Sequence, residues 1–293
     1  MKHLSQVLLL STLLGGCAEE FEPYSRITGF RVLAVRAEPP SPLPGQTAVF
    51  DVLVAGAPAE DVRFQWSWCP VLGGADRDFD CLVTPEDLGL SSDLGRRPTA
   101  SFSFDGSAAQ LQSLCRQLQA SPLALFAEVP DCEQGIEISI ILEAEASDRR
   151  IRSVKSLELL FGLEDQVPNQ NPVVDAIVLP SGAVDRDTEV QLSASIPESE
   201  SETYFGVPRS DPGGDPREVR EQLFFSWFTT GGGFDPERRS FIPGETTFST
   251  AAATALEVPL QADFPASTLG LYLVVRDDRG GVSWTDALMQ VRP

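Results

Sequence analysis

The sequence predicts an all-β chain built from two tandem β-sandwich domains. Three observations support this. Several segments alternate apolar and polar residues with the period of two that is typical of half-buried strands. Each half of the chain has such a strand with Trp on its apolar side, and a polar Pro/Asn stretch without periodicity separates the halves. We therefore expect a first domain over residues 29–163, a linker over 164–172 and a second domain over 173–293.

The clearest strand of the first half covers residues 62–68, where Val62, Phe64, Trp66 and Trp68 share one face and polar residues share the other. The same alternation runs over residues 136–145, with Ile141 as the one apolar residue on the polar side. Further strands of this half are expected over residues 29–37, 47–55, 99–104 and 150–161.

One segment of the first half has helical spacing instead. Leu111, Leu114, Cys115 and Leu118 recur at i, i+3, i+4 and i+7, behind Ser107 and Gln110 placed as a capping box. The pattern predicts a short amphipathic helix that covers the core and carries Cys115 on its apolar face. A helix that docks into a partner's groove is the alternative.

Six strands are expected in the second half. They cover residues 173–179, 189–196, 222–229, 255–260, 269–276 and 282–291. Leu223, Phe225 and Trp227 share one face of the third of these strands, and the leucines of 269–276 share one face of the fifth.

At roughly 110 to 140 residues, each half matches the size and strand count of an immunoglobulin-like sandwich. In the second half, Trp227 on the presumed third strand and the Leu-rich strand that runs into Asp277-Asp278-Arg279-Gly280-Gly281 are similar to the PKD and related immunoglobulin-like modules of bacterial envelope proteins. The first half departs from the immunoglobulin pattern, because its cysteines do not lie in the middle of the second and sixth strands.

The N-terminus has the features of an export signal. Lys2 and His3 precede an apolar stretch over residues 7–14, which is too short to span a bilayer core of about 30 Å. The stretch runs into Leu14-Gly15-Gly16-Cys17, which resembles the lipobox of bacterial lipoproteins. The resemblance implies that residues 1–16 are a signal peptide, that Cys17 is acylated, and that residues 17–28 are a spacer.

The residue after Cys17 is Ala18 rather than Asp, which by the enterobacterial sorting rule implies the outer membrane. The whole arrangement, from the lipobox through 30–40 to 168–172, resembles predicted lipoproteins of myxobacteria. That resemblance covers most of the chain and implies a cell-envelope location, but it brings no established activity.

With Cys17 assigned to the lipid, Cys69, Cys81, Cys115 and Cys132 remain, and two disulfides are expected in an exported chain. The sequence leaves all three pairings open. The local pairing, 69 with 81 and 115 with 132, would close short loops worth about 3 kcal/mol each. Zinc is the competing interpretation, but the spacings contain no C-x-x-C unit and no histidine is present to help.

Signal cleavage would remove His3, the only histidine, and leave 21 basic against 43 acidic residues, a formal charge of −22. Without histidine no Ser-His-Asp or Cys-His arrangement exists, and neither G-x-S-x-G nor a Walker A sequence occurs. A carboxylate-pair glycosidase remains open on composition alone. The acidic balance argues against nucleic-acid binding, which depends on Lys and Arg at phosphates. We therefore expect no enzyme and no nucleic-acid partner.

Two sets of candidate site residues lie in the second half. Asp277 and Asp278, at the same predicted end as the acidic insert 197–221, could offer oxygen ligands to calcium, although no spaced ligand loop is present and solvated acidic loops are the alternative. Phe234 and Phe241, in the loop over 230–248, could contact a partner or fold back into the local core.

Sandwich topology further predicts a rod of two domains placed end to end. The long loops 70–98 and 105–135 of the first half would face the insert 197–221 and the turn 277–281 of the second, and the loop 230–248 would crown the tip farthest from the lipid. These loops either buttress the junction or form a ligand site in its crevice.

The function expected from the sequence is that of a non-enzymatic, membrane-anchored envelope lipoprotein, acting as a structural, assembly or protein-interaction module. The alternative is a surface module that binds carbohydrate or calcium. The expected partners are the bilayer, through the acylated Cys17, and an envelope protein or polysaccharide.

Overall fold

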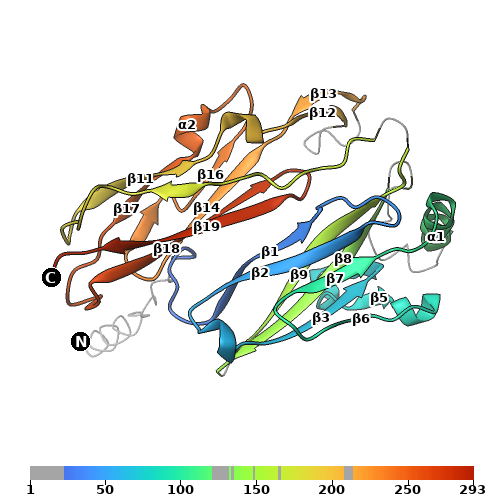
Figure 1. Cartoon of the computed structure of the whole chain (residues 1–293), viewed down its shortest axis with the longest axis horizontal. Coiled ribbons are helices and arrows are strands. Elements are labelled where there is room, and N and C mark those ends of the chain that lie inside the picture. The colour runs from blue at the N-terminus through green and yellow to red at the C-terminus, as the bar shows by residue number, and fades with distance from the viewer. Residues whose placement is uncertain (1–22, 121–131, 133–134, 148, 164–165, 208–213) are drawn as a thin grey trace, which may run out of the picture.

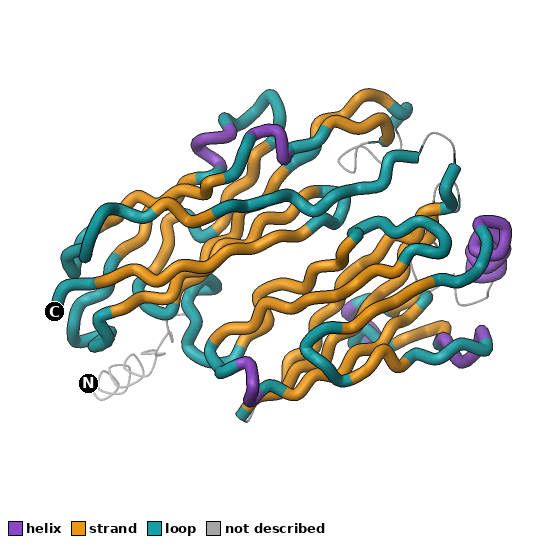
Figure 2. The backbone as a smooth tube through the Cα atoms, in the orientation of Figure 1, coloured by secondary structure: helices purple, strands orange, loops and turns teal. Residues whose placement is uncertain are grey.

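The protein consists of two immunoglobulin-like β-sandwiches, as the sequence predicts, with short helices only at the periphery (Figures 1 and 2). The computed structural model describes residues 23–120, 132, 135–147, 149–163, 166–207 and 214–293. Cys17 and the signal segment lie outside these residues. Within the part described, no helix is both long and apolar enough to cross a membrane.

In the first sandwich, one sheet has the strand order β1-β2-β7 and the other β6-β3-β8-β9, with every pair antiparallel. The chain thus changes sheet between β2 and β3 and again around β7, as in immunoglobulin-like folds. The strands are β1 (Arg31–Glu38), β2 (Thr47–Ala55), β3 (Arg63–Cys69), β6 (Asp93–Gly95), β7 (Ala100–Ser103), β8 (Gly135–Ala146) and β9 (Arg149–Leu160).

Smaller elements fill the connections of this sandwich. They are the strand pair β4 (Val71–Leu72) and β5 (Cys81–Val83), the 3-10 helices η1 (Ala59–Asp61), η2 (Ala75–Arg77) and η3 (Pro85–Leu88), and the helix α1 (Ala108–Ala120). The predicted capping box of α1 is present: Gln110 N donates to Ser107 Oγ at 3.3 Å and Ser107 N donates to Gln110 Oε1 at 2.7 Å.

The alternation of apolar and polar residues along the strands explains the hydrophobic core of the first sandwich. The indole of Trp66 is fully buried and lies 6.0 Å, between ring centroids, from Phe50 of the facing sheet. Leu111, Cys115 and Leu118, the predicted apolar face of α1, are buried in the same cluster. The helix therefore covers the core.

The second sandwich has two four-stranded sheets, with orders β10-β11-β17-β15 and β16-β14-β18-β19. Its strands are β10 (Ala176–Val178), β11 (Glu189–Ser195), β14 (Leu223–Thr229), β15 (Gly233–Asp235), β16 (Arg238–Phe241), β17 (Ala253–Glu257), β18 (Thr268–Asp277) and β19 (Val282–Gln290). The insert 197–221 contains η5 (Glu198–Glu200) and the hairpin of β12 (Thr203–Gly206) with β13 (Arg217–Arg220), and α2 (Phe248–Ala251) precedes β17.

Trp227 lies at the centre of the second core and is fully buried. Phe234, 9% exposed, packs against Trp227, and Phe241, 4% exposed, packs edge-on against Phe248. Of the two alternatives for Phe234 and Phe241, contact with a partner is therefore wrong and folding back into the local core is correct, because β15 and β16 fold back onto the sandwich.

Each disulfide joins two cysteines that follow one another in the order of cysteines along the chain, so the local pairing is the correct one. Cys69 at the end of β3 is joined to Cys81 of β5, with a Cα to Cα distance of 5.7 Å. Cys115 of α1 is joined to Cys132, just before β8, at 5.8 Å. The second bond thus holds the helix to the segment that enters the central strand of the sheet.

The two sandwiches lie side by side rather than end to end (Figures 1 and 2). The edge strand β1 runs between β9 of its own sandwich and β19 of the other, and contacts both. The expected rod is therefore wrong. The chain reverses direction at the linker and packs the flank of one sandwich against the flank of the other.

Candidate functional site

Among the residues that the structure describes, the polar and charged side chains that could form a functional site lie mainly where the two sandwiches meet. Part of this junction is the segment that precedes β1. Ile27 N donates to Thr229 O at 2.8 Å and Thr229 N donates to Ser25 O at 2.9 Å, which adds a short parallel bridge to the end of β14. The Tyr24 ring packs 5.5 Å from Phe228, with the Arg238 guanidinium 3.9 Å from its centroid. The expected spacer is therefore bound to the second sandwich from residue 24 onward.

An apolar contact continues this junction along the strands. It joins Leu33 and Ala34 of β1 to Val274 of β18 and Val282 of β19, all of them buried, together with Ile27, Ala55 and Phe228. A bulge in β1 between Val32 and Ala34 turns Leu33 toward the second sandwich. The outward faces of β14, β18 and β19 are therefore apolar near the first sandwich.

The linker connects the two sandwiches through the hydrogen bonds of Asn169 and Asn171, which we call the clamp. Asn171 Nδ2 donates to Ala37 O and to Glu38 Oε2, both at 2.7 Å, while Asn171 Oδ1 accepts from Val282 N at 2.8 Å. One side chain thus bridges β1 of the first sandwich and β19 of the second.

Asn169 and Asp277 form a second, buried part of the clamp. Asn169 Nδ2 donates to both oxygens of Asp277 at 3.1 and 3.2 Å, and Asp277 Oδ1 also accepts from Arg279 N and Gly281 N at 2.8 and 2.7 Å. A side chain at Gly281 would collide with this carboxylate. Asp277 therefore holds the turn between β18 and β19 and ties it to the linker.

This arrangement bears on the calcium hypothesis. The oxygens of Asp277 accept protein hydrogen bonds, and Asp278 lies half-buried in the same turn. Among the residues that the structure describes, no group of three or more His, Cys, Asp or Glu side chains is placed to hold a metal ion. Calcium binding at Asp277 and Asp278 stays a prediction that this geometry does not support.

Beside the clamp lies a group of carboxylates around one guanidinium. Glu221 is 1% exposed, and its Oε1 accepts from Arg279 Nη1 at 3.1 Å. Glu202 Oε2 lies 3.9 Å from the same Nη1. Burial, followed by the charge of Asp277, raises the pKa of Glu221 to about 8, and burial also raises the pKa of Glu202. Arg279 opposes both shifts and also donates to Val167 O in the linker.

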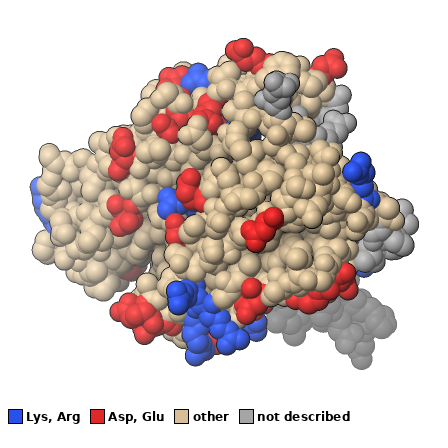
Figure 3. Space-filling view, turned by 45° about the vertical axis from the view of Figure 1, so that its right-hand side comes forward, with Lys and Arg blue, Asp and Glu red and all other residues tan. Residues whose placement is uncertain are grey.

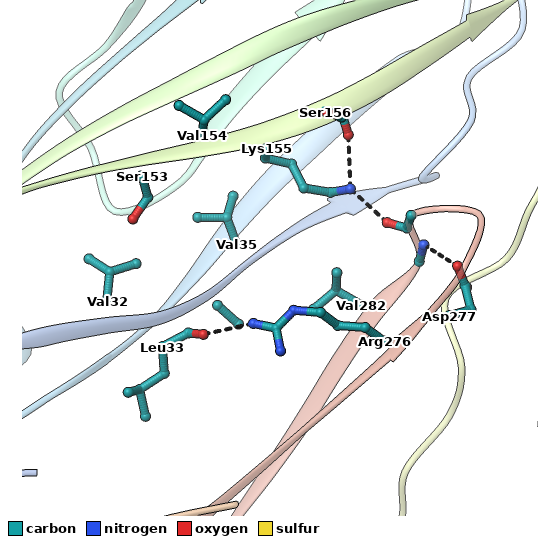
Figure 4. Close-up of a pocket in the computed structure, with 13 residues that line it drawn as sticks. Val32, Leu33, Val35, Ser153, Val154, Lys155, Ser156, Arg276, Asp277 and Val282 are labelled. Carbon is teal, nitrogen blue, oxygen red and sulfur yellow. Dashed lines mark hydrogen bonds between the residues drawn. The ribbon is translucent and has the colours of Figure 1, made fainter. Parts of the chain in front are cut away.

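A crevice of about 240 Å³ opens between the sandwiches next to this group (Figure 4). Its walls come from β1, β9 and the turn between β18 and β19. Lys155 Nζ donates to Ser156 O at 2.9 Å and to Gly280 O at 2.6 Å, and Arg276 Nη2 donates to Leu33 O at 2.9 Å. Each of the two sandwiches thus contributes one cation to the crevice and one hydrogen bond across the junction.

Charged side chains are spread over the face of the molecule that Figure 3 shows. Acidic side chains occur in several separate groups over this face, and basic side chains gather mainly along its lower edge. On this face the acidic side chains are therefore not concentrated at one point.

Sequence reasoning missed the residues that hold the junction, notably Asn169, Asn171, Glu221 and Arg276. The linker composition offered one signal: two Asn separated by a single residue can satisfy backbone groups on both sides of a boundary. The other signal was apolar residues on both faces of β14 and β18, such as Phe228 and Val274. The loops 70–98 and 105–135, expected at the junction, supply none of the interdomain hydrogen bonds described above, whereas the turn 277–281 does lie there.

No known family model matches the chain, and no curated protein matches it. Among solved structures, it is similar to the three N-terminal domains of the bacteriophage RB49 highly immunogenic outer capsid protein, at 11% identity and a TM-score of 0.22 over 90% of this chain and 59% of that one. It is also similar to murine CEACAM1b, at 9% identity and a TM-score of 0.24 over 89% of this chain and 99% of that one. The chain thus matches somewhat less than two thirds of the capsid protein fragment. The fold assignment rests on the chain's own sheet topology.

Proposed function

We propose that this protein is a non-enzymatic lipoprotein of the cell envelope, held to a membrane, most readily the outer membrane, by an acylated Cys17, and that it serves as a structural or protein-interaction module. The observation that carries the proposal is the docked segment before β1. Only residues 18–23 separate the lipobox cysteine from Tyr24, which packs against Phe228. A lipid on Cys17 would therefore hold both sandwiches close to the membrane through a short tether.

The docking also orients the protein relative to such an anchor. The N-terminal segment meets β14 at its last residue, Thr229, whereas the β12–β13 hairpin lies just before the first residue, Leu223. The length of β14, about 20 Å at 3.3 Å per residue, separates the two. The hairpin would face away from the membrane, and the loop after Thr229 would lie near the anchor rather than at the far tip.

The membrane-distal hairpin presents the partner-binding surface in this proposal. Phe205 of β12 is 72% exposed, the largest exposure among the large apolar side chains described. Aromatic side chains are enriched where proteins bind proteins.

The anchor is tested by expressing the full chain and its Cys17→Ser variant in a bacterial host with a lipoprotein pathway and labelling with a fatty acid. We expect the label and detergent-phase partitioning in the parent and their loss in the variant. The double variant Cys69→Ser/Cys81→Ser is the matched control and should keep both. Label that persists in Cys17→Ser would contradict the proposal.

The partner surface is tested with a photoreactive amino acid at position 205, and at position 288 as a control, because Leu288 is 69% exposed but lies on β19 near the anchor end. Crosslinks to an envelope protein from position 205 alone are expected. Equal crosslinking from both positions would argue against a distal binding surface.

A further inference from the structure

The crevice between the two sandwiches contains a cation without a carboxylate partner. Arg276 is half-buried, and the hydrogen bond to Leu33 O uses one of its five N–H groups. In the part of the chain that the structure describes, no Asp or Glu oxygen lies within ion-pair distance of this guanidinium. Removing a charge from water without a counter-ion is costly, and proteins usually pair such a group.

Two further cations, Arg238 and Lys155, lie in the surroundings of Arg276. Burial is the main cause that lowers the pKa of Arg276; Tyr24 opposes this shift, and the nearby Arg238 adds to it. Across the crevice, the Lys155 ammonium lines the opposite wall (Figure 4). The third charged side chain in the wall, Asp277, directs its oxygens to Asn169 and to the N–H groups of its own turn.

The remaining lining indicates what else a ligand would contact. Ser153 of β9 supplies a hydroxyl group, Ser156 supplies its backbone carbonyl, and Val32, Val35 and Val282 supply an apolar wall. A volume of about 240 Å³ accommodates a small molecule rather than a chain segment. These features together fit a ligand with one oxyanion and a short aliphatic part.

We propose that the crevice between β1, β9 and the β18–β19 turn is a binding site for a small organic anion, whose carboxylate or phosphate group pairs with Arg276 and Lys155 and whose aliphatic part contacts the valines. Because β1 and β9 belong to one sandwich and Arg276 to the other, the bound anion bridges the two. The proposal does not depend on the lipid anchor.

The test uses the protein beginning at the residue after Cys17 and titrates it calorimetrically at low ionic strength with three probes: 3-methylbutanoate, inorganic phosphate and the neutral 3-methylbutanamide. We expect saturable binding of 3-methylbutanoate, and none of the amide, because the amide lacks the charge. Binding of phosphate alone would assign the site to oxyanions without an aliphatic part and overturn the role of the valines.

Arg276→Gln should weaken binding of 3-methylbutanoate at least tenfold, the effect of losing one charge-assisted hydrogen bond. Arg292→Gln, which removes the same charge from an exposed ion pair with Asp185, is the matched control and should bind as the parent does. Arg276→Lys, which keeps a charge and a donor for Leu33 O, guards against loss of binding through misfolding and should bind more tightly than Arg276→Gln. Absence of binding in the parent, or equal losses in Arg276→Gln and Arg292→Gln, would overturn the proposal.

Discussion

Glu221 Oε1 accepts a hydrogen bond from Arg279 Nη1 at 3.1 Å, and yet the pKa of Glu221 is raised to about 8. The cause is the position of the pair. Glu221 is almost completely buried, and the negative charges of Asp277 and Glu202 also raise its pKa. The Arg279 guanidinium is shared between Glu221 and Glu202, so burial and repulsion together outweigh its attraction for Glu221.

The protein should therefore become less stable as the pH rises through the range in which only the folded state keeps Glu221 protonated. The ordinary pKa of the group is 4.5, and its pKa in the folded state is about 8. Between these values the folded chain binds the extra proton, so the free energy of unfolding falls with rising pH. Glu221→Gln should flatten this fall and stabilise the protein above pH 8, by on the order of 2 to 4 kcal/mol. Urea unfolding at pH 5, 7 and 9 measures the effect.

Glu218→Gln, an exposed change on the neighbouring hairpin strand, is the matched control and should leave the slope with pH unchanged. An unaltered slope in Glu221→Gln would mean that the proton is taken up elsewhere in the group. In that case Glu202→Gln, whose pKa is also raised by burial, should flatten the curve instead.

Asn171→Ala should loosen the junction of the two sandwiches. The substitution removes two donated hydrogen bonds and leaves Val282 N without its acceptor. Loss of a buried hydrogen-bond partner costs about 1 to 3 kcal/mol. We expect faster proteolytic cleavage within residues 161–172 and a larger radius of gyration by solution X-ray scattering, while each sandwich keeps its secondary structure. Gln191→Ala, which removes only an exposed contact with Glu189, should change neither measurement.

Local pattern predicted most of the strands because each depends on its own alternation. The segments 62–68 and 136–145 appear as β3 and β8, and 189–196 appears as β11, within two residues at each end. The helix α1 followed from the spacing of Leu111 and Leu118. In each case burial of one face outweighs weaker local preferences.

Elements without a long periodic face were missed. The β12–β13 hairpin lies in the acidic insert, and its contacts to the sandwich come from single side chains such as Tyr204, whose ring lies 4.5 Å from the Arg279 guanidinium. The β4–β5 pair is only two or three residues long and is fixed by the Cys69–Cys81 bond. Such short strands depend on tertiary contacts that a single sequence does not display.

The side-by-side arrangement could not be derived from strand parity. Parity assigns residues to two faces but does not say which outward face is covered by another domain. Val274 and Phe228 lie on the outward faces of their strands and are nevertheless buried, by β1 and by the segment before it. The candidate site follows from this contact, since Arg276, Lys155 and Asn171 acquire their roles only when the two sandwiches meet.

Tyr24→Ala should release the segment that precedes β1. Tyr24 packs on Phe228 and lies under the guanidinium groups of Arg31 and Arg238. Aromatic and cation–π contacts of this kind are worth about 1 to 2 kcal/mol together. The amide proton of Ile27, which is bonded to Thr229 O, should then exchange at least tenfold faster with solvent. Phe205→Ala is the control on a distant ring, and unchanged exchange at Ile27 in Tyr24→Ala would show that the backbone bridge alone holds the segment.

Loss of either disulfide should destabilise the first sandwich and leave the second intact. The two bonds join cysteines 12 and 17 residues apart, and loops of that length are worth about 3 kcal/mol each in the chain-entropy model. Cys115→Ala/Cys132→Ala should also free α1, whose Cys115 is buried against the core, so amides of 108–120 should lose protection in hydrogen exchange. Cys69→Ala/Cys81→Ala should instead expose the β4–β5 pair while α1 stays protected.

Because Trp227 and its neighbours form a core of their own, amides of β14 and β18 should keep their protection in both variants. Simultaneous loss of protection in both sandwiches would show that the junction makes them a single cooperative unit.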